Sequence, residues 1–79
     1  MILIDYPMNG WCHLVADNIE SLHEFAKKID VKRCWFHNKR RAKRPHYDIR
    51  EAKLKLALDN GAKLVTSFEV VLFLKKHYA

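Results

Sequence analysis

The segment Lys63-Leu-Val-Thr-Ser-Phe-Glu69 predicts a short strand that runs directly into a helix. Its first half is mostly apolar, and Thr66 and Glu69 stand three residues apart, as in a capping box. In a capping box the two side chains satisfy free backbone N–H groups at the start of a helix. We expect the helix to continue through Val70 to Leu74, although these five consecutive apolar residues also suit a buried strand.

The same order of strand and helix is predicted twice more towards the amino terminus. Ile2 to Ile4 is an apolar run typical of a buried strand, and the capping box Asp17-Asn-Ile-Glu20 predicts the helix after it. Val31 to His37 contains aromatic residues that favour a second strand. The capping box Asp48-Ile-Arg-Glu51 then predicts a helix that ends at Gly61.

Three strands that alternate with three helices predict an α/β fold, a Rossmann-like half unit with a small, mostly parallel sheet of three strands. The 79 residues suit one domain, 1–79. Trp11 and His13 are expected in a loop that runs through Asn9-Gly10, and Leu14-Val15 is too short to assign. In open parallel sheets, ligands bind beyond the carboxyl ends of the strands, where we expect Asp5, His37 and Ser67.

The excess positive charge is concentrated in one segment. The net charge is +6, and seven basic residues but no acidic ones lie between Lys32 and Tyr47. A local patch of this kind attracts anions, and arginine in particular matches phosphate, so we predict an anion-binding loop at 38–45 rather than a merely solvated one. Its binding residues are Lys39, Arg40, Arg41, Lys43 and Arg44.

The composition argues against a zinc finger, a membrane-spanning protein and a secreted protein. Cys12 and Cys34 lie far apart and match no zinc-finger spacing, which favours reduced thiols. The longest apolar run, Val70 to Leu74, is far shorter than the roughly 20 residues that cross a bilayer. With no signal segment at its start, the chain is predicted to be cytoplasmic and to have no membrane partner. Self-association stays open, because so short a chain buries only a modest core.

The chain has five histidines, and three of them, His13, His37 and His46, are candidate site residues. His37 and His46 bracket the basic loop, so closure of the loop brings them together, with Asp48 close by. We expect His46, Asp48 and His37 to carry any catalysis. A ligand-binding role is predicted for Asp5, His13, His37, His46, Tyr47 and Ser67.

Structural roles compete with these assignments. Asp17 and Asp48 are explained as helix caps, His23 as a packed histidine, and Trp11 and Trp35 as core or loop-anchoring aromatics. No histidine pair has the spacing of a known metal motif, so the sequence leaves open whether the cofactor is a divalent metal ion.

Several short blocks, taken together and in order, resemble a known family over almost the whole chain. The blocks are Met1-Ile-Leu-Ile-Asp5, His13-Leu-Val-Ala-Asp17, Leu22-His-Glu-Phe-Ala26, Phe36-His37, His46-Tyr-Asp48, and Gly61-Ala62 with Val65-Thr-Ser67. They are similar to the small bacterial and phage proteins grouped as domain of unknown function family 4031. The resemblance implies that the polar residues of these blocks, His23 included, fall on recurring polar positions of the family. The usual pattern lacks the long basic insertion, and the family brings no established activity.

Three functions follow as expectations. The first is a small phage or bacterial accessory protein that binds a phosphate-bearing ligand, a nucleotide or nucleic acid, at the carboxyl edge of the sheet with help from the basic loop. The second is a metal-dependent phosphodiesterase or nuclease, in which Asp5 and Asp48 hold the ion and a histidine acts as general acid or base. The third is a factor that docks on an acidic host protein through the loop. The residues leave open whether the protein is an enzyme.

Overall fold

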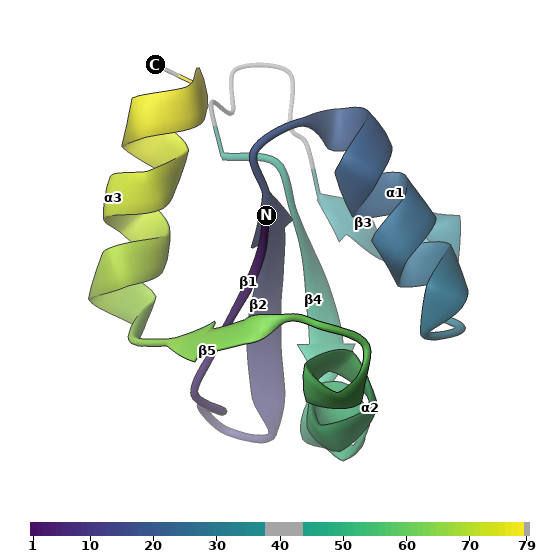
Figure 1. Cartoon of the computed structure of the whole chain (residues 1–79). Coiled ribbons are helices and arrows are strands. Elements are labelled where there is room, and N and C mark those ends of the chain that lie inside the picture. The colour runs from purple at the N-terminus through teal and green to yellow at the C-terminus, as the bar shows by residue number, and fades with distance from the viewer. Residues whose placement is uncertain (38–43, 79) are drawn as a thin grey trace.

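A computed structural model describes residues 1–37 and 44–78 and shows a mixed sheet with helices packed on both faces (Figure 1). Among the described residues five strands form the sheet, and of their pairings only that of β1 with β5 is parallel. In their order across the sheet the strands are β3 (Phe36–His37), β4 (His46–Arg50), β2 (Trp11–Ala16), β1 (Ile2–Asp5) and β5 (Lys63–Val65). The helices are α1 (Ile19–Lys28), α2 (Leu54–Asp59) and α3 (Ser67–Tyr78).

The predicted sheet of three mostly parallel strands is wrong, first because Trp11–Ala16 forms strand β2 in the centre of the sheet. β1 and β2 form an antiparallel hairpin. The chain reverses at Asn9 and Gly10, whose φ angles are 54° and 83°, and Met8 and Trp11 exchange two backbone hydrogen bonds across the turn. Two consecutive positive φ angles are typical of the turn that Asn-Gly favours in two-residue hairpins. The signal for a hairpin was therefore in the sequence.

The second error concerns Asp48, which lies inside strand β4 and caps no helix. Its neighbours Tyr47 and Ile49 are buried, so the segment alternates between the two faces as a strand does. Pairing with β2 outweighs the local capping box, and α2 begins only after a 3-10 turn over Glu51–Lys53. Its predicted end is confirmed, since Gly61 has a φ of 104° just beyond the helix.

The other two predicted helices are confirmed, with one change of cap. Thr66 caps α3, because its Oγ1 accepts a hydrogen bond from the Glu69 amide at 3.1 Å. At α1 the cap is Asn18, whose side chain accepts from the Ser21 amide at 2.8 Å. Asp17 instead pairs with the amino terminus at 3.3 Å.

The predicted strands have mixed outcomes. Those predicted at Ile2 to Ile4 and Lys63 to Thr66 are confirmed as β1 and β5. The one expected over Val31 to His37 is reduced to the two residues of β3 after a 3-10 turn over Arg33–Trp35. Most of the basic loop, 38–43, lies outside the described residues.

The two faces of the sheet differ in how far they are covered. On one face α1 and α2 bury the main core, which contains Ile4, Leu14 and Ile49. On the other face α3 packs on Leu3 and Val15, that is, over β1 and β2. This leaves the part of the second face formed by β2, β4 and β3 for polar side chains. In the described ranges no helix is long and apolar enough to cross a membrane, and the cytoplasmic location stays a prediction.

Candidate functional site

Strand register gathers four polar side chains on the open part of the α3 face. His13 on β2 pairs directly with Asp48 on β4, and His37 on β3 pairs with His46 on β4. Within β4, His46 and Asp48 are two residues apart and so point to the same face. Three strands thus contribute to one group, which we call the Asp48 cluster: His13, His37, His46 and Asp48.

Asp48 is at the centre of this cluster. Its Oδ1 is 3.2 Å from the Nε2 of His46 and 3.6 Å from the Nε2 of His13. Its Oδ2 is 3.2 Å from the Nε2 of His37. The ring of His46 stacks on that of His37, and the two centroids are 5.3 Å apart. All three histidines therefore direct the same nitrogen, Nε2, at one carboxylate.

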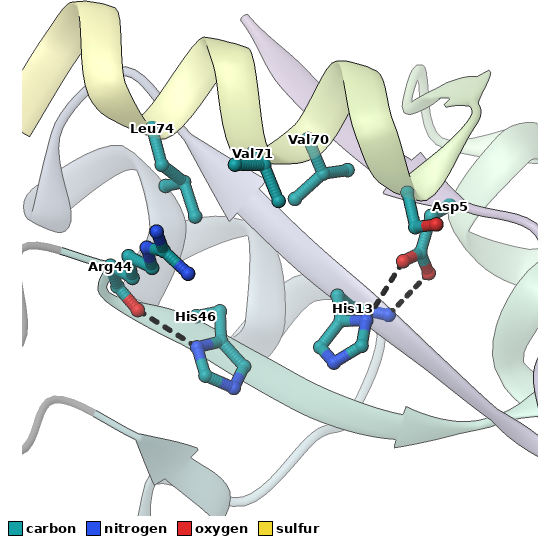
Figure 2. A pocket seen from close by; sticks show the side chains of 8 residues that line it. Asp5, His13, Arg44, His46, Val70, Val71 and Leu74 are labelled. Carbon is teal, nitrogen blue, oxygen red and sulfur yellow. Dashed lines mark hydrogen bonds and ion pairs between the residues drawn. The ribbon is translucent and has the colours of Figure 1, made fainter.

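The opposite nitrogen of His13 is held by Asp5. The Nδ1 of His13 is 2.8 Å from Asp5 Oδ2, and the backbone amide of His13 donates to Asp5 Oδ1 at 2.6 Å (Figure 2). Asp5 is only 2% exposed, and both of its carboxylate oxygens contact His13. The hydrogen bond to Asp5 raises the pKa of His13 above its ordinary 6.5; burial opposes this rise, and the charges of Asp5 and Asp48 add to it.

His46 is fixed in a comparable way by a backbone carbonyl. Its Nδ1 lies 2.8 Å from the carbonyl oxygen of Arg44 (Figure 2). A carbonyl can only accept a hydrogen bond, so this contact requires a proton on Nδ1. In the neutral ring the lone pair is then on Nε2, the nitrogen that faces Asp48.

The cluster offers the ligand atoms of a metal site. His13, His46 and Asp48 each offer one ligand atom, and these three atoms all lie within 4.8 Å of one another. A tetrahedral zinc ion with bonds of 2.0–2.1 Å to nitrogen holds its ligand atoms about 3.3 Å apart. The two measured separations, 3.2 and 3.6 Å, are close to that spacing.

Two cavities flank the cluster, and His13 contributes to both. The first, of about 200 Å³, lies between the sheet and α3, which gives it an apolar wall (Figure 2). We call it the α3 cavity; its lining is Asp5, His13, Arg44, His46, Ser67, Val70, Val71 and Leu74. The second, of about 340 Å³, we call the tryptophan cavity; its lining is Trp11, His13, Trp35, His37 and Asp48.

Most of the predicted site residues come together, but only some lie where the sequence placed them. Asp5, Arg44 and Ser67 line the α3 cavity beside the cluster. Asp5 and Ser67 do lie at the carboxyl ends of the parallel strands β1 and β5, as expected. The same position is wrong for His37, which lies in an antiparallel pair, and the Asp48 cluster as a whole projects from the face of the antiparallel strands.

Other predicted residues are not part of this group. Tyr47 is buried on the opposite face, where its hydroxyl is 2.7 Å from His23 Nδ1. Burial raises the pKa of Tyr47 and lowers that of His23, and the charge of Arg33 lowers both. Of the predicted anion-binding residues only Arg44 is described; Lys39, Arg40, Arg41 and Lys43 lie outside the described residues.

The sequence interpretation undervalued the two tryptophans. Trp11 and Trp35 are 40% and 39% exposed and line the same cavity as Asp48, rather than filling the core. The available signal was the alternation along β2, in which exposed Trp11 and His13 flank buried Cys12. That pattern puts the indole and the imidazole on one face.

Comparison with known proteins agrees with the blocks noted in the sequence. The model of a family described as "Protein of unknown function (DUF4031)" matches residues 2–77, which confirms the resemblance. No curated protein and no solved structure matches the chain.

Proposed function

The chain belongs to the DUF4031 family, and we propose that it binds a divalent transition-metal ion at the Asp48 cluster and hydrolyses a phosphate ester there. One observation carries the proposal. The Nδ1 atoms of His13 and His46 are each held by a hydrogen-bond acceptor, which leaves their Nε2 atoms directed at one oxygen of Asp48.

The nature of these groups supports a metal ion. Neutral imidazole is the commonest metal ligand among side chains, and two nitrogens with one carboxylate oxygen form a recurring ligand set of catalytic zinc sites. Metal-binding histidines generally donate their second N–H to a carboxylate or a backbone carbonyl. Asp5 and the Arg44 carbonyl supply one of each. Asp5 therefore supports a ligand in this proposal and is not itself a ligand.

Positive charge next to the cluster supports a phosphate-bearing substrate. Arg44 lines the α3 cavity together with His13 and His46. A guanidinium group matches two phosphate oxygens at once, and the net charge of +6 attracts anions to the protein. Phosphate oxygens are also natural partners of a divalent cation.

Hydrolysis requires one bond to form and one to break at phosphorus. A metal ion, when bound, polarises the phosphate and lowers the pKa of a coordinated water. The water oxygen bonds to phosphorus and releases a proton to the solvent, the ester P–O bond breaks, and the leaving oxygen takes up a proton. His37 is suited to supply that proton, because its Nε2 is 3.2 Å from Asp48 while its ring lines the tryptophan cavity.

Two other functions use parts of the same surface. Binding of a phosphate-bearing ligand without hydrolysis is supported by the same positive charge and the same cavities. Docking on an acidic host protein uses the basic segment too, but it gives the Asp48 cluster no role. The ordered Nδ1 contacts therefore favour the metal-dependent function over docking.

Zinc titration and hydrolysis of a simple diester test the proposal. The protein is freed of metal with a chelator, and zinc binding is followed by calorimetry for the native chain, His46→Ala and Asp48→Asn. His77→Ala is the matched control, because His77 is an exposed histidine on α3 outside the cluster. We expect one zinc ion to bind to the native protein and the control, and much weaker binding to the other two variants.

The same four proteins are then assayed with bis(p-nitrophenyl) phosphate, a diester without a nucleobase. Turnover that needs zinc and is lost in His46→Ala supports hydrolysis. Zinc binding without turnover would leave the function as metal-dependent ligand binding. Zinc binding that is equal in all four proteins, or absent from the native one, contradicts the proposal.

A further inference from the structure

Two large aromatic side chains line the tryptophan cavity instead of the core. Trp11 begins β2, and Trp35 directly precedes β3, so the two indoles come from opposite sides of β4. They are 40% and 39% exposed. A domain of this size gains most of its stability from burying such groups, so their exposure beside one cavity calls for a binding role.

The lining of the cavity combines aromatic and polar side chains. Its remaining lining residues, His13, His37 and Asp48, all belong to the Asp48 cluster. Its volume of about 340 Å³ is at the small end of the range for ligand sites, roughly 300–1,000 Å³. A flat group stacked on an indole here lies directly beside the proposed metal position.

Arginines stand on both sides of the cluster. Arg50 pairs with Trp11 across β2 and β4, and its guanidinium carbon is 4.4 Å from the centre of the Trp11 ring. Arg44 lines the α3 cavity on the other side of His13. A ligand that crosses the cluster from one cavity to the other therefore meets positive charge at each end.

These features together define the chemistry of the ligand. We propose that the tryptophan cavity binds a base of a single-stranded nucleic acid, whose flanking phosphates meet Arg50 on one side and Arg44 on the other. Bases stack on exposed aromatic rings without regard to sequence, and only an unpaired strand can present them this way. A mononucleotide has a phosphate on one side of its base only, which leaves one arginine unused. Attachment of a phosphate to the metal rests on the proposed function; stacking of the base does not.

Oligonucleotides with and without bases provide the test. A labelled thymidine oligomer of about eight nucleotides, within the usual site size of about 4–16, is compared with an abasic oligomer of the same length. Binding is measured by fluorescence anisotropy in chelator, where metal-dependent hydrolysis cannot occur. We expect the native protein to bind the thymidine oligomer more tightly than the abasic one, and thymidine monophosphate more weakly than the oligomer.

Substitutions then assign the preference to the cavity. Trp11→Ala and Trp35→Ala are each expected to weaken binding of the thymidine oligomer roughly 5- to 150-fold, the change that matches the measured cost of losing one stacked base. Trp11→Phe keeps an aromatic face and should retain most of the binding, even if Trp11→Ala folds poorly. Phe68→Ala is the control, since Phe68 is an exposed aromatic residue on α3, 70% exposed and outside the cavity lining.

Failure of this inference is distinct from failure of the proposed function. Equal binding of the thymidine and abasic oligomers, or unchanged binding in both tryptophan→alanine variants, overturns the base site even where zinc is bound and the simple diester is hydrolysed. If the protein binds no zinc but prefers bases in a way that depends on the tryptophans, the base site is supported and the metal site is contradicted. Tighter binding of the monophosphate than of the oligomer rejects the strand as ligand.

Discussion

At the scale of single residues, the behaviour of the cluster depends on Asp5, a side chain that does not belong to it. Both Asp5 oxygens are used by His13, one by its ring and one by its backbone amide. The carboxylate accepts from Nδ1, so in the neutral ring the proton is on Nδ1 and the lone pair is on Nε2, the nitrogen available to a metal. The sequence predicts Asp5 as a direct ligand of the site. Its partner in the structure is His13, which the pairing of β1 with β2 brings next to it.

Asp5→Asn should weaken zinc binding about 10- to 100-fold while preserving the fold. An amide NH₂ next to His13 Nδ1 favours the ring tautomer with its proton on Nε2, which blocks the metal-binding nitrogen. Calorimetry with the metal-free variant measures the change, and thermal unfolding checks the fold. A variant that folds normally and binds zinc as tightly as the native protein would show that Asp5 does not orient His13.

His23 predicts a pH dependence of stability on the opposite face of the sheet. Burial, with a smaller contribution from Arg33, lowers its pKa below the ordinary 6.5. The unfolded chain therefore takes up a proton at His23 at a higher pH than the folded chain does. The free energy of unfolding falls as the pH drops through about 6.5 towards the lowered pKa.

His23→Gln should remove this part of the acid sensitivity. Urea unfolding at about pH 7.5 and about pH 5.5, in chelator, gives the loss of stability between the two pH values for each protein. We expect the loss to be smaller in the variant than in the native protein. An equal loss in both would mean that His23 is as easily protonated in the folded state as in the unfolded chain.

At the scale of the elements, three similar sequence patterns have three different outcomes. Thr66-x-x-Glu69 opens a helix as predicted, Asp17-x-x-Glu20 precedes a helix that Asn18 caps, and Asp48-x-x-Glu51 lies largely in a strand. Local hydrogen bonding at a cap contributes only about 1 kcal/mol. Burial of Tyr47 and Ile49 against the main core outweighs it at β4. A four-residue pattern indicates a possible cap, but whether a helix begins there depends also on strand pairing with distant residues.

The hairpin between β1 and β2 could have been predicted from Asn9-Gly10, and it aligns His13 with its partners. Gly10 has a φ of 83°, and a Cβ there would meet nothing within 4 Å, so only backbone strain opposes a side chain. Gly10→Ala should therefore destabilise the protein by about 1–2 kcal/mol. Gly10→Asn should cost less, because asparagine tolerates this conformation. Urea unfolding of both variants measures this, and a Gly10→Ala variant as stable as the native protein would contradict it.

At the scale of the whole molecule, the mixed sheet explains why the site residues were easier to predict than their location. The identities of His13, His37, His46 and Asp48 follow from their chemistry, whichever fold is assumed. Their location requires the order β3-β4-β2, which joins segments whose pairing no local pattern specifies. Helix α3 covers β1 and only the Val15 end of β2. The rest of that face is open, and the polar side chains gather there. The molecule thus combines the Asp48 cluster, two exposed tryptophans and a net charge of +6 in a small domain.

The most direct test of the account is nitrogen NMR of the five imidazole rings during zinc titration of the metal-free protein. Each ring nitrogen reports separately whether it is protonated, free or bound to metal. We expect Nε2 of His13 and of His46 to become metal-bound while their Nδ1 atoms stay protonated, and His23 and His77 not to change. If His13 and His46 keep their zinc-free signals at saturating zinc, or bind through Nδ1, the Asp48 cluster is not the metal site.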